Sequence, residues 1–102
     1  MRILCVCDKG VNRAVHIASL LKFRGHDTIP VGTETSSPET LETLYDWADA
    51  VIVTNSDHRV LFPIGKKMWL WQMDDLPRPY NKHLCKQTLV YIDEYRDRLE
   101  GA

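Results

Sequence analysis

Hydrophobic positions along the chain fall into short apolar runs, typical of buried strands, and stretches with apolar residues every three or four positions, typical of helices. The apolar runs predict strands at 1–7, 27–31, 50–53 and 67–71. Helical periodicity predicts helices from Arg13, from Pro38 and over 84–99, and a short helix over 56–61. This alternation predicts a single α/β domain over residues 1–102, a four-stranded parallel sheet with helices on both faces.

The strand predicted at 27–31 contains Pro30, which has no N–H to donate to a neighbouring strand. This strand is therefore expected at an edge of the sheet, with the first strand at the centre and the strand order 2-1-3-4. In such a sheet, ligands bind beyond the carboxyl ends of the strands, near the switch between the first and third strands. The residues that follow Cys7 are expected at that point.

Local signals predict where the helices end and which side they bury. Gly25 is expected to end the first helix, and Ser36 or Ser37 to cap the second. The residues of the last helix that are expected to face the core are Cys85, Leu89, Ile92, Tyr95 and Leu99.

Composition and charge exclude several classes of protein. Hydrophobic residues make up 44% of the chain and charged residues 26%, and the net charge of −1 gives no basic excess for nucleic acid or an anionic membrane. No apolar run approaches the roughly 20 residues that span a bilayer, and the start of the chain does not resemble a signal peptide. The odd number of cysteines, without the spacing of a metal site, predicts free thiols in a reducing cytosol.

The candidate chemistry lies in a Cys-x5-Arg pattern, Cys7 to Arg13, between the first strand and the first helix. A loop of this length can wrap its backbone N–H groups around a phosphate, toward which the helix directs its positive end. These groups favour the thiolate of Cys7 as a nucleophile, and Arg13 offers a planar fork to two phosphate oxygens. The predicted phosphate-binding residues are Asp8, Lys9, Gly10, Val11, Asn12 and Arg13.

The segment 3–7, with this loop and Arg13, resembles the opening of the low-molecular-weight protein tyrosine phosphatases. The segment 47–53, followed by His58 and Arg59, resembles a small bacterial and phage branch of that family. The resemblance implies a two-step hydrolysis of a phosphotyrosine protein or a small aryl phosphate, through a cysteinyl-phosphate and without a metal or organic cofactor.

The resemblance also implies that an aspartate from the loop after the fourth strand protonates the leaving oxygen. Asp75 fits this role best, and Asp74 fits it if the alignment shifts by one residue.

Other polar and thiol side chains have plainer interpretations. His58 and Arg59 are expected to be a solvated pair near a helix start, although they match the resemblance. Cys5 is expected to pack in the core. Cys85 fits a core cysteine better than a resolving thiol.

Two alternatives remain open. Cys7 and Gly10 also fit the Cys-x-x-Gly of phosphotransferase-system IIB components, which carry a phosphoryl group on cysteine; Arg13 and the acidic loop favour a hydrolase. A phosphate-binding module without turnover is the other alternative, because Ala14 stands where the family usually has Ser or Thr.

Overall fold

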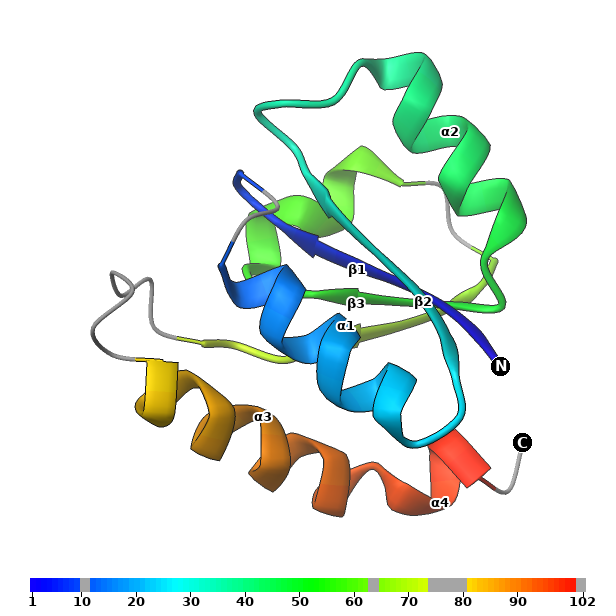
Figure 1. Ribbon diagram of the computed structural model, residues 1–102. Helices are drawn as coiled ribbons and strands as arrows, with labels where there is room; N and C mark the ends of the chain where they lie inside the picture. The colour runs from blue at the N-terminus through cyan, green and yellow to red at the C-terminus, as the bar shows by residue number, and fades with distance from the viewer. Residues whose placement is uncertain (10–11, 63–64, 74–80, 101–102) are drawn as a thin grey trace.

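Four parallel strands, in the order β2-β1-β3-β4, form the centre of the structure (Figure 1). The strands are β1 (Arg2–Cys7), β2 (Asp27–Gly32), β3 (Ala50–Val53) and β4 (Lys67–Leu70). The structure is a computed structural model that describes residues 1–9, 12–62, 65–73 and 81–100. The predicted strand order is confirmed, and β2, which contains Pro30, lies at an edge.

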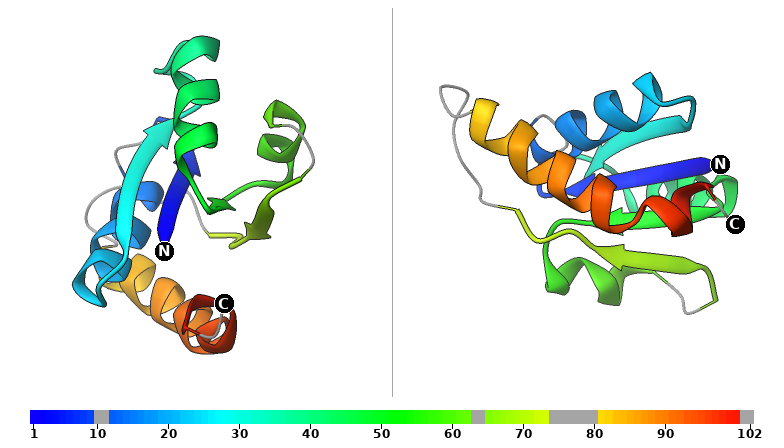
Figure 2. Two further views of the ribbon diagram at one scale, coloured as in Figure 1. Left: turned by 90° about the vertical axis from the view of Figure 1, so that its right-hand side faces the viewer. Right: turned by 90° about the horizontal axis from the view of Figure 1, so that it is seen from below.

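Helices cover both faces of the sheet, as predicted (Figure 2). They are α1 (Arg13–Phe23), α2 (Pro38–Trp47), the 3₁₀-helix η1 (Ser56–Leu61), α3 (Asn81–Glu94) and α4 (Arg96–Glu100). Gly25, just beyond α1, has a φ of 95°, and the Ser37 Oγ caps α2 by accepting the Thr40 N–H at 3.1 Å. None of the described helices has the length and apolar character needed to cross a membrane.

The alternation of side chains along β1 divides the interior into two layers. Ile3, Cys5 and Cys7 pack with α1 and α3, whereas Leu4 and Val6 pack with α2. The whole of β1 beyond Arg2 is therefore buried, as expected for the central strand of a parallel sheet with two covered faces.

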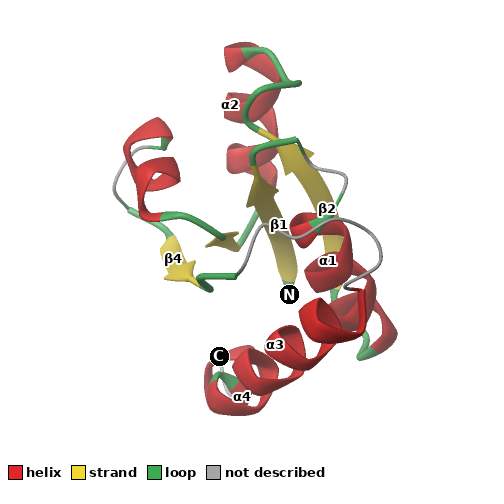
Figure 3. Ribbon diagram, turned by 90° about the vertical axis from the view of Figure 1, so that its left-hand side faces the viewer, coloured by secondary structure: helices red, strands yellow, loops and turns green. Residues whose placement is uncertain are grey.

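The end of the chain differs from its predicted register. α3 packs against α1 through a face that includes Leu84 and Thr88, and Leu89, expected inward, is 41% exposed (Figure 3). The Thr88 hydroxyl donates to the Leu84 carbonyl at 2.8 Å, so a polar residue is satisfied inside the core. Cys85 is half-buried instead of lying in the core.

The turn after β2 is bound closely to the chain that leaves β1. The backbone N–H groups of Thr33 and Glu34 donate to the carbonyls of Cys7 and Asp8 at 2.9 and 2.8 Å. The Thr35 hydroxyl donates to the Lys9 carbonyl at 3.2 Å. Three successive carbonyls are thereby turned toward the segment that follows β2.

Gly32 makes this approach possible. A Cβ at this position would lie 2.3 Å from the carbonyl carbon of Lys9 and 2.5 Å from its oxygen. Because backbone atoms cannot give way as a flexible side chain would, only glycine fits without moving the segment after β1.

Gly32→Ala is expected to lower the free energy of unfolding by about 1–3 kcal/mol, the usual cost of overpacking. Hydrogen exchange of the Thr33 and Glu34 amides should also accelerate, because their acceptors are displaced. Gly25→Ala is the control: it introduces strain at a positive φ but meets no atom within 4 Å. If the Thr33 and Glu34 amides exchanged at the same rates in Gly32→Ala as in Gly25→Ala, this account would be contradicted.

Lys66 stabilises the carboxyl end of α2. Its Nζ donates to the carbonyls of Tyr45, Asp46 and Ala48, at 3.0 Å for Asp46 and 2.7 Å for Ala48. It also lies 4.6 Å from the centre of the Tyr45 ring. A cation at this helix end satisfies carbonyls that have no partner within the helix and complements the helix dipole.

Lys66→Met is expected to lower the free energy of unfolding by about 1–2 kcal/mol, since the carbonyl bonds and the cation–π contact are lost together. Urea denaturation measures the difference. Lys67→Met removes the same charge from the exposed neighbouring residue and should have little effect. Similar losses in both variants would exclude the capping role.

Candidate active site

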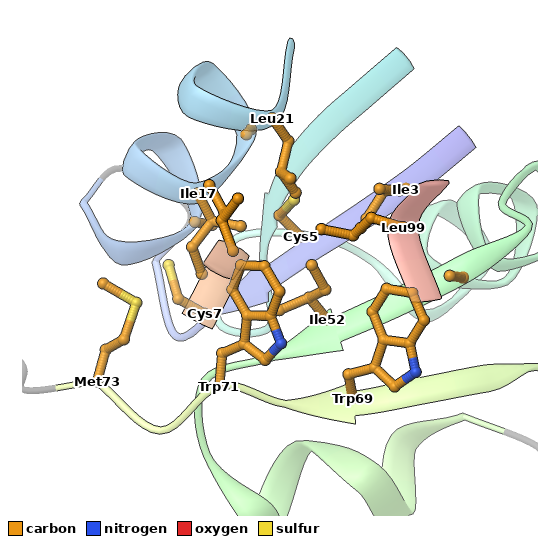
Figure 4. Packing of buried hydrophobic residues seen from close by; sticks show 14 of the residues in the cluster. Ile3, Cys5, Cys7, Ile17, Leu21, Ile52, Trp69, Trp71, Met73 and Leu99 are labelled. Carbon is orange, nitrogen blue, oxygen red and sulfur yellow. The ribbon is translucent and has the colours of Figure 1, made fainter. Parts of the chain in front are cut away.

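Cys7 is the last residue of β1 and lies at the carboxyl edge of the sheet. It is 2% exposed, on the side of the sheet that also holds Ile17 and Trp71 (Figure 4). Because β1 lies between β2 and β3, the chain beyond Cys7 enters the switch region where α/β proteins bind ligands. The predicted position of Cys7 at the carboxyl edge, beside the switch between β1 and β3, is therefore confirmed.

Hydrogen bonds with the turn after β2 fix the direction of the backbone after Cys7. In a trans peptide, the carbonyl of one residue and the N–H of the next point in opposite directions. The carbonyls of Cys7 and Asp8 point toward Thr33 and Glu34, so the N–H groups of Asp8 and Lys9 point to the opposite side. Two successive N–H groups therefore lie on the side of the chain away from the turn after β2.

Arg13 is the first residue of α1 and is 5% exposed. Its Nη2 donates to the Asp8 Oδ2 at 3.2 Å, so the two ends of the loop are joined by an ion pair. The expectation of an arginine held at the far end of the loop agrees with this geometry. Asp8, which binds the Arg13 side chain, is the residue directly after Cys7.

His58, in η1, completes this cluster, and its predicted solvation is wrong. Its side chain is 5% exposed, and its Nε2 lies 2.8 Å from the Asp8 Oδ1. Arg59 is exposed, as predicted. The sequence contained a usable signal: η1 follows β3, and in the predicted strand order the residues beyond β1 and β3 meet at one edge.

Each oxygen of the Asp8 carboxylate therefore accepts one hydrogen bond, Oδ1 from His58 and Oδ2 from Arg13. The hydrogen bond from His58, followed by the charge and hydrogen bond of Arg13, holds the pKa of Asp8 below its ordinary value of 3.8 against the opposing effect of desolvation. Asp8 consequently remains a carboxylate in mildly acidic solution. This group of three, Asp8, Arg13 and His58, is called the Asp8 cluster below.

Cys5 lies two residues before Cys7 on the same face of β1. Burial, with a smaller effect of Cys7, raises the pKa of its thiol far above the usual range. Cys5 therefore stays a neutral thiol and packs in the core, as predicted.

The chain that leaves β4 is fixed by α3 up to Met73. Trp71 stacks on Tyr91 with ring centres 5.4 Å apart, and the Tyr91 hydroxyl donates to the Gln72 carbonyl at 2.9 Å. Met73 is buried and belongs to the same cluster as Cys7, at the same end of it (Figure 4). Asp74 and Asp75 follow directly and lie outside the described residues.

The remaining predicted residues have varied positions. Lys9 is exposed, and the Asn12 carbonyl lies 2.8 Å from the His16 Nδ1 at the start of α1. Gly10 and Val11 lie outside the described residues. Across the parts of the chain that the structure describes, no three His, Cys, Asp or Glu side chains gather as metal ligands would.

Comparisons with protein-family models and with curated proteins give no match. Solved structures do match. The YwlE arginine phosphatase from Geobacillus stearothermophilus aligns over 95% of this chain and 94% of its own, with a TM-score of 0.63 and 19% identity.

A thioredoxin-dependent arsenate reductase from Corynebacterium glutamicum aligns over 97% of this chain and 61% of its own, with a TM-score of 0.62 and 14% identity. At these identities the likeness concerns the fold. The chain thus has the α/β fold of the low-molecular-weight tyrosine phosphatases, a fold that also carries arsenate reduction.

Proposed function

We propose that this chain is a cysteine-dependent phosphomonoester hydrolase that acts on aryl phosphates such as phosphotyrosine. The observation that carries the proposal is that Cys7 and a buried Arg13 stand at the two ends of one loop between β1 and α1. A thiol, a helix N-terminus and a guanidinium at the carboxyl edge of a parallel sheet suit attack on a bound oxyanion. The fold shared with a phosphatase and an arsenate reductase supports this class of chemistry.

In the first step, the Cys7 thiolate attacks phosphorus and an S–P bond forms while the P–O bond to the leaving alcohol breaks. The charge on the equatorial oxygens is stabilised by the guanidinium of Arg13 and by loop N–H groups, including those of Asp8 and Lys9. Asp75 donates a proton to the leaving oxygen.

In the second step, water attacks phosphorus, its proton passes to the carboxylate of Asp75, and the S–P bond breaks. Inorganic phosphate and the Cys7 thiolate are released. An acid from residues 74–80 is supported by the packing of Met73, because the chain enters that segment from the cluster that also contains Cys7.

The burial of Arg13 favours a hydrolase over a phosphoryl carrier. A carrier holds its phosphoryl group mainly through backbone amides, whereas a hydrolase needs a fixed cation to stabilise charge in the transition state. Arg13 is fixed through Asp8 at 3.2 Å. Ala14, which is fully buried, has no hydroxyl where the family usually has Ser or Thr. A phosphate-binding module without turnover is therefore the other outcome to test.

Hydrolysis of para-nitrophenyl phosphate at mildly acidic pH tests the proposal. Cys7→Ser should abolish turnover, and Arg13→Ala should lower kcat/KM by about a hundredfold or more, because charge stabilisation is lost. Asp75→Asn should lower kcat by about a hundredfold, the usual contribution of a general acid, and Asp74→Asn should retain most activity. If Asp74→Asn is the damaged variant, the acid is Asp74.

Cys85→Ser and Arg59→Ala are the matched controls, since each removes the same chemical group outside the loop. Phosphate binding without hydrolysis by freshly reduced protein would contradict the hydrolase and identify a binding module. Phosphorylation of Cys7 solely by a partner protein would identify a carrier. Phosphoarginine is a useful second substrate, and its exclusive turnover would overturn the aryl-phosphate specificity but not the hydrolase.

A further inference from the structure

The Asp8 cluster joins three segments of the chain at the carboxyl edge of the sheet. Asp8 follows β1, Arg13 begins α1, and His58 lies in η1 after β3. The contacts run in series, from His58 to one oxygen of Asp8 at 2.8 Å and from the other oxygen to Arg13 at 3.2 Å. A group adjacent to the candidate nucleophile is thus connected to a buried side chain 50 residues away.

We propose that His58 and Asp8 are positioning residues that hold the guanidinium of Arg13 in the orientation in which it binds phosphate. The inference rests on the proposed function and concerns how the same site is organised. Neither side chain is expected to touch the reacting atoms; the Asp8 carboxylate and the His58 ring both act through Arg13.

Asp8 is held in place without the help of Arg13. Its carbonyl accepts the Glu34 N–H at 2.8 Å, and its Oδ1 is bound to His58. A carboxylate that is fixed at both its backbone and its side chain provides a rigid reference point for a flexible arginine. Such a carboxylate is also poorly suited to swing away when substrate enters.

His58 has a burial that calls for an explanation. Among the described residues, the polar partner of its ring is Asp8, at Nε2, and the buried Nδ1 has no hydrogen-bond partner. Burying an imidazole with half of its polar atoms unsatisfied costs stability. A role in fixing Asp8 accounts for its presence.

The contact between Asp8 and Arg13 is compatible with substrate binding. It uses the Nη2 nitrogen, and a guanidinium carries several N–H donors arranged as a planar fork. One edge of the fork can be held by a carboxylate while another faces a phosphate. The low pKa of Asp8, caused first by the His58 hydrogen bond, keeps the carboxylate charged under assay conditions.

A competing interpretation makes the opposite prediction. If Asp8 occupied the fork as a substitute for phosphate, substrate would have to displace it, and removing its charge would strengthen phosphate binding. Loss of a negative charge beside the loop favours an incoming dianion in any case. Of the two interpretations, only a positioning role for Asp8 therefore predicts weaker phosphate binding in Asp8→Asn.

The first test measures binding of inorganic phosphate by calorimetry, which needs no turnover, together with kcat and KM for para-nitrophenyl phosphate. Asp8→Asn is expected to bind phosphate several-fold more weakly and to lose about a hundredfold in kcat, as misplaced catalytic groups do. Tighter phosphate binding, or a raised kcat/KM, would overturn the proposal and identify Asp8 as a resting-state competitor.

The second test compares His58→Gln with His58→Asn. The glutamine amide reaches the position of Nε2 and can still donate to Asp8, whereas the asparagine amide is one carbon shorter. His58→Gln should retain most of the wild-type kcat and phosphate affinity, and His58→Asn should lose both to the same degree as Asp8→Asn. Arg59→Gln, an exposed change on the same 3₁₀-helix, should leave both unchanged.

A double variant, His58→Asn with Asp8→Asn, should be no worse than Asp8→Asn alone, because the two residues act in series. Additive losses would overturn the proposal, as would equal activity of the Gln and Asn variants at His58. Thermal unfolding of each variant confirms that the proteins compared are folded.

The outcomes separate this inference from the proposed function. If wild-type protein binds phosphate but does not hydrolyse the ester, the hydrolase fails and the positioning role is judged on phosphate affinity alone. If wild-type protein hydrolyses the ester and the Asp8 and His58 variants match it, only the positioning role fails. If wild-type protein neither binds phosphate nor hydrolyses the ester, both fail.

Discussion

A buried cation at the start of a helix is the constraint from which the rest of the candidate site follows. Arg13 is 5% exposed and is the first residue of α1, where the positive end of the helix dipole disfavours a cation. Removing a guanidinium from water at such a place is unfavourable unless an opposite charge lies beside it. Asp8 supplies that charge, and a phosphate dianion would be attracted by both the guanidinium and the helix.

The parallel sheet provides the groups that meet this need. Because β1 and β3 are neighbours and run in the same direction, the residues just beyond them, Asp8 and His58, reach the same edge. On the other side of β1, the turn after β2 binds the carbonyls of Cys7, Asp8 and Lys9 and so orients the peptide groups of the loop. The segment after β3 therefore holds the Asp8 carboxylate through His58, and the segment after β2 fixes the direction of the backbone after Cys7.

Much of this architecture could be predicted from the sequence, because it depends on local patterns. Apolar runs identified the strands, and Pro30 identified the edge. The errors share a cause: Leu89 was expected inward and His58 outward from residue type alone, although a polar side chain can be buried wherever a hydrogen-bond partner lies beside it. The burial of Thr88 is tolerated because its hydroxyl donates to a carbonyl of its own helix, and that of His58 because Asp8 accepts from its ring. Gly10, Val11, Asp74 and Asp75 remain predictions from the sequence.

In the proposed hydrolysis, the Asp8 cluster also bears on the departure of the cysteine thiolate, for which the resemblance implies a hydroxyl after the loop arginine. Ala14 offers none and is fully buried in the core. The proposed mechanism therefore assigns the stabilisation of the leaving thiolate to loop N–H groups, to the helix N-terminus and to Arg13. A carboxylate adjacent to Cys7 would oppose this, since like charges repel. The ion pair with Arg13 and the hydrogen bond with His58 partly offset the negative charge of the Asp8 carboxylate. The same contacts that are proposed to position Arg13 thus limit the electrostatic cost of having an aspartate next to the candidate nucleophile.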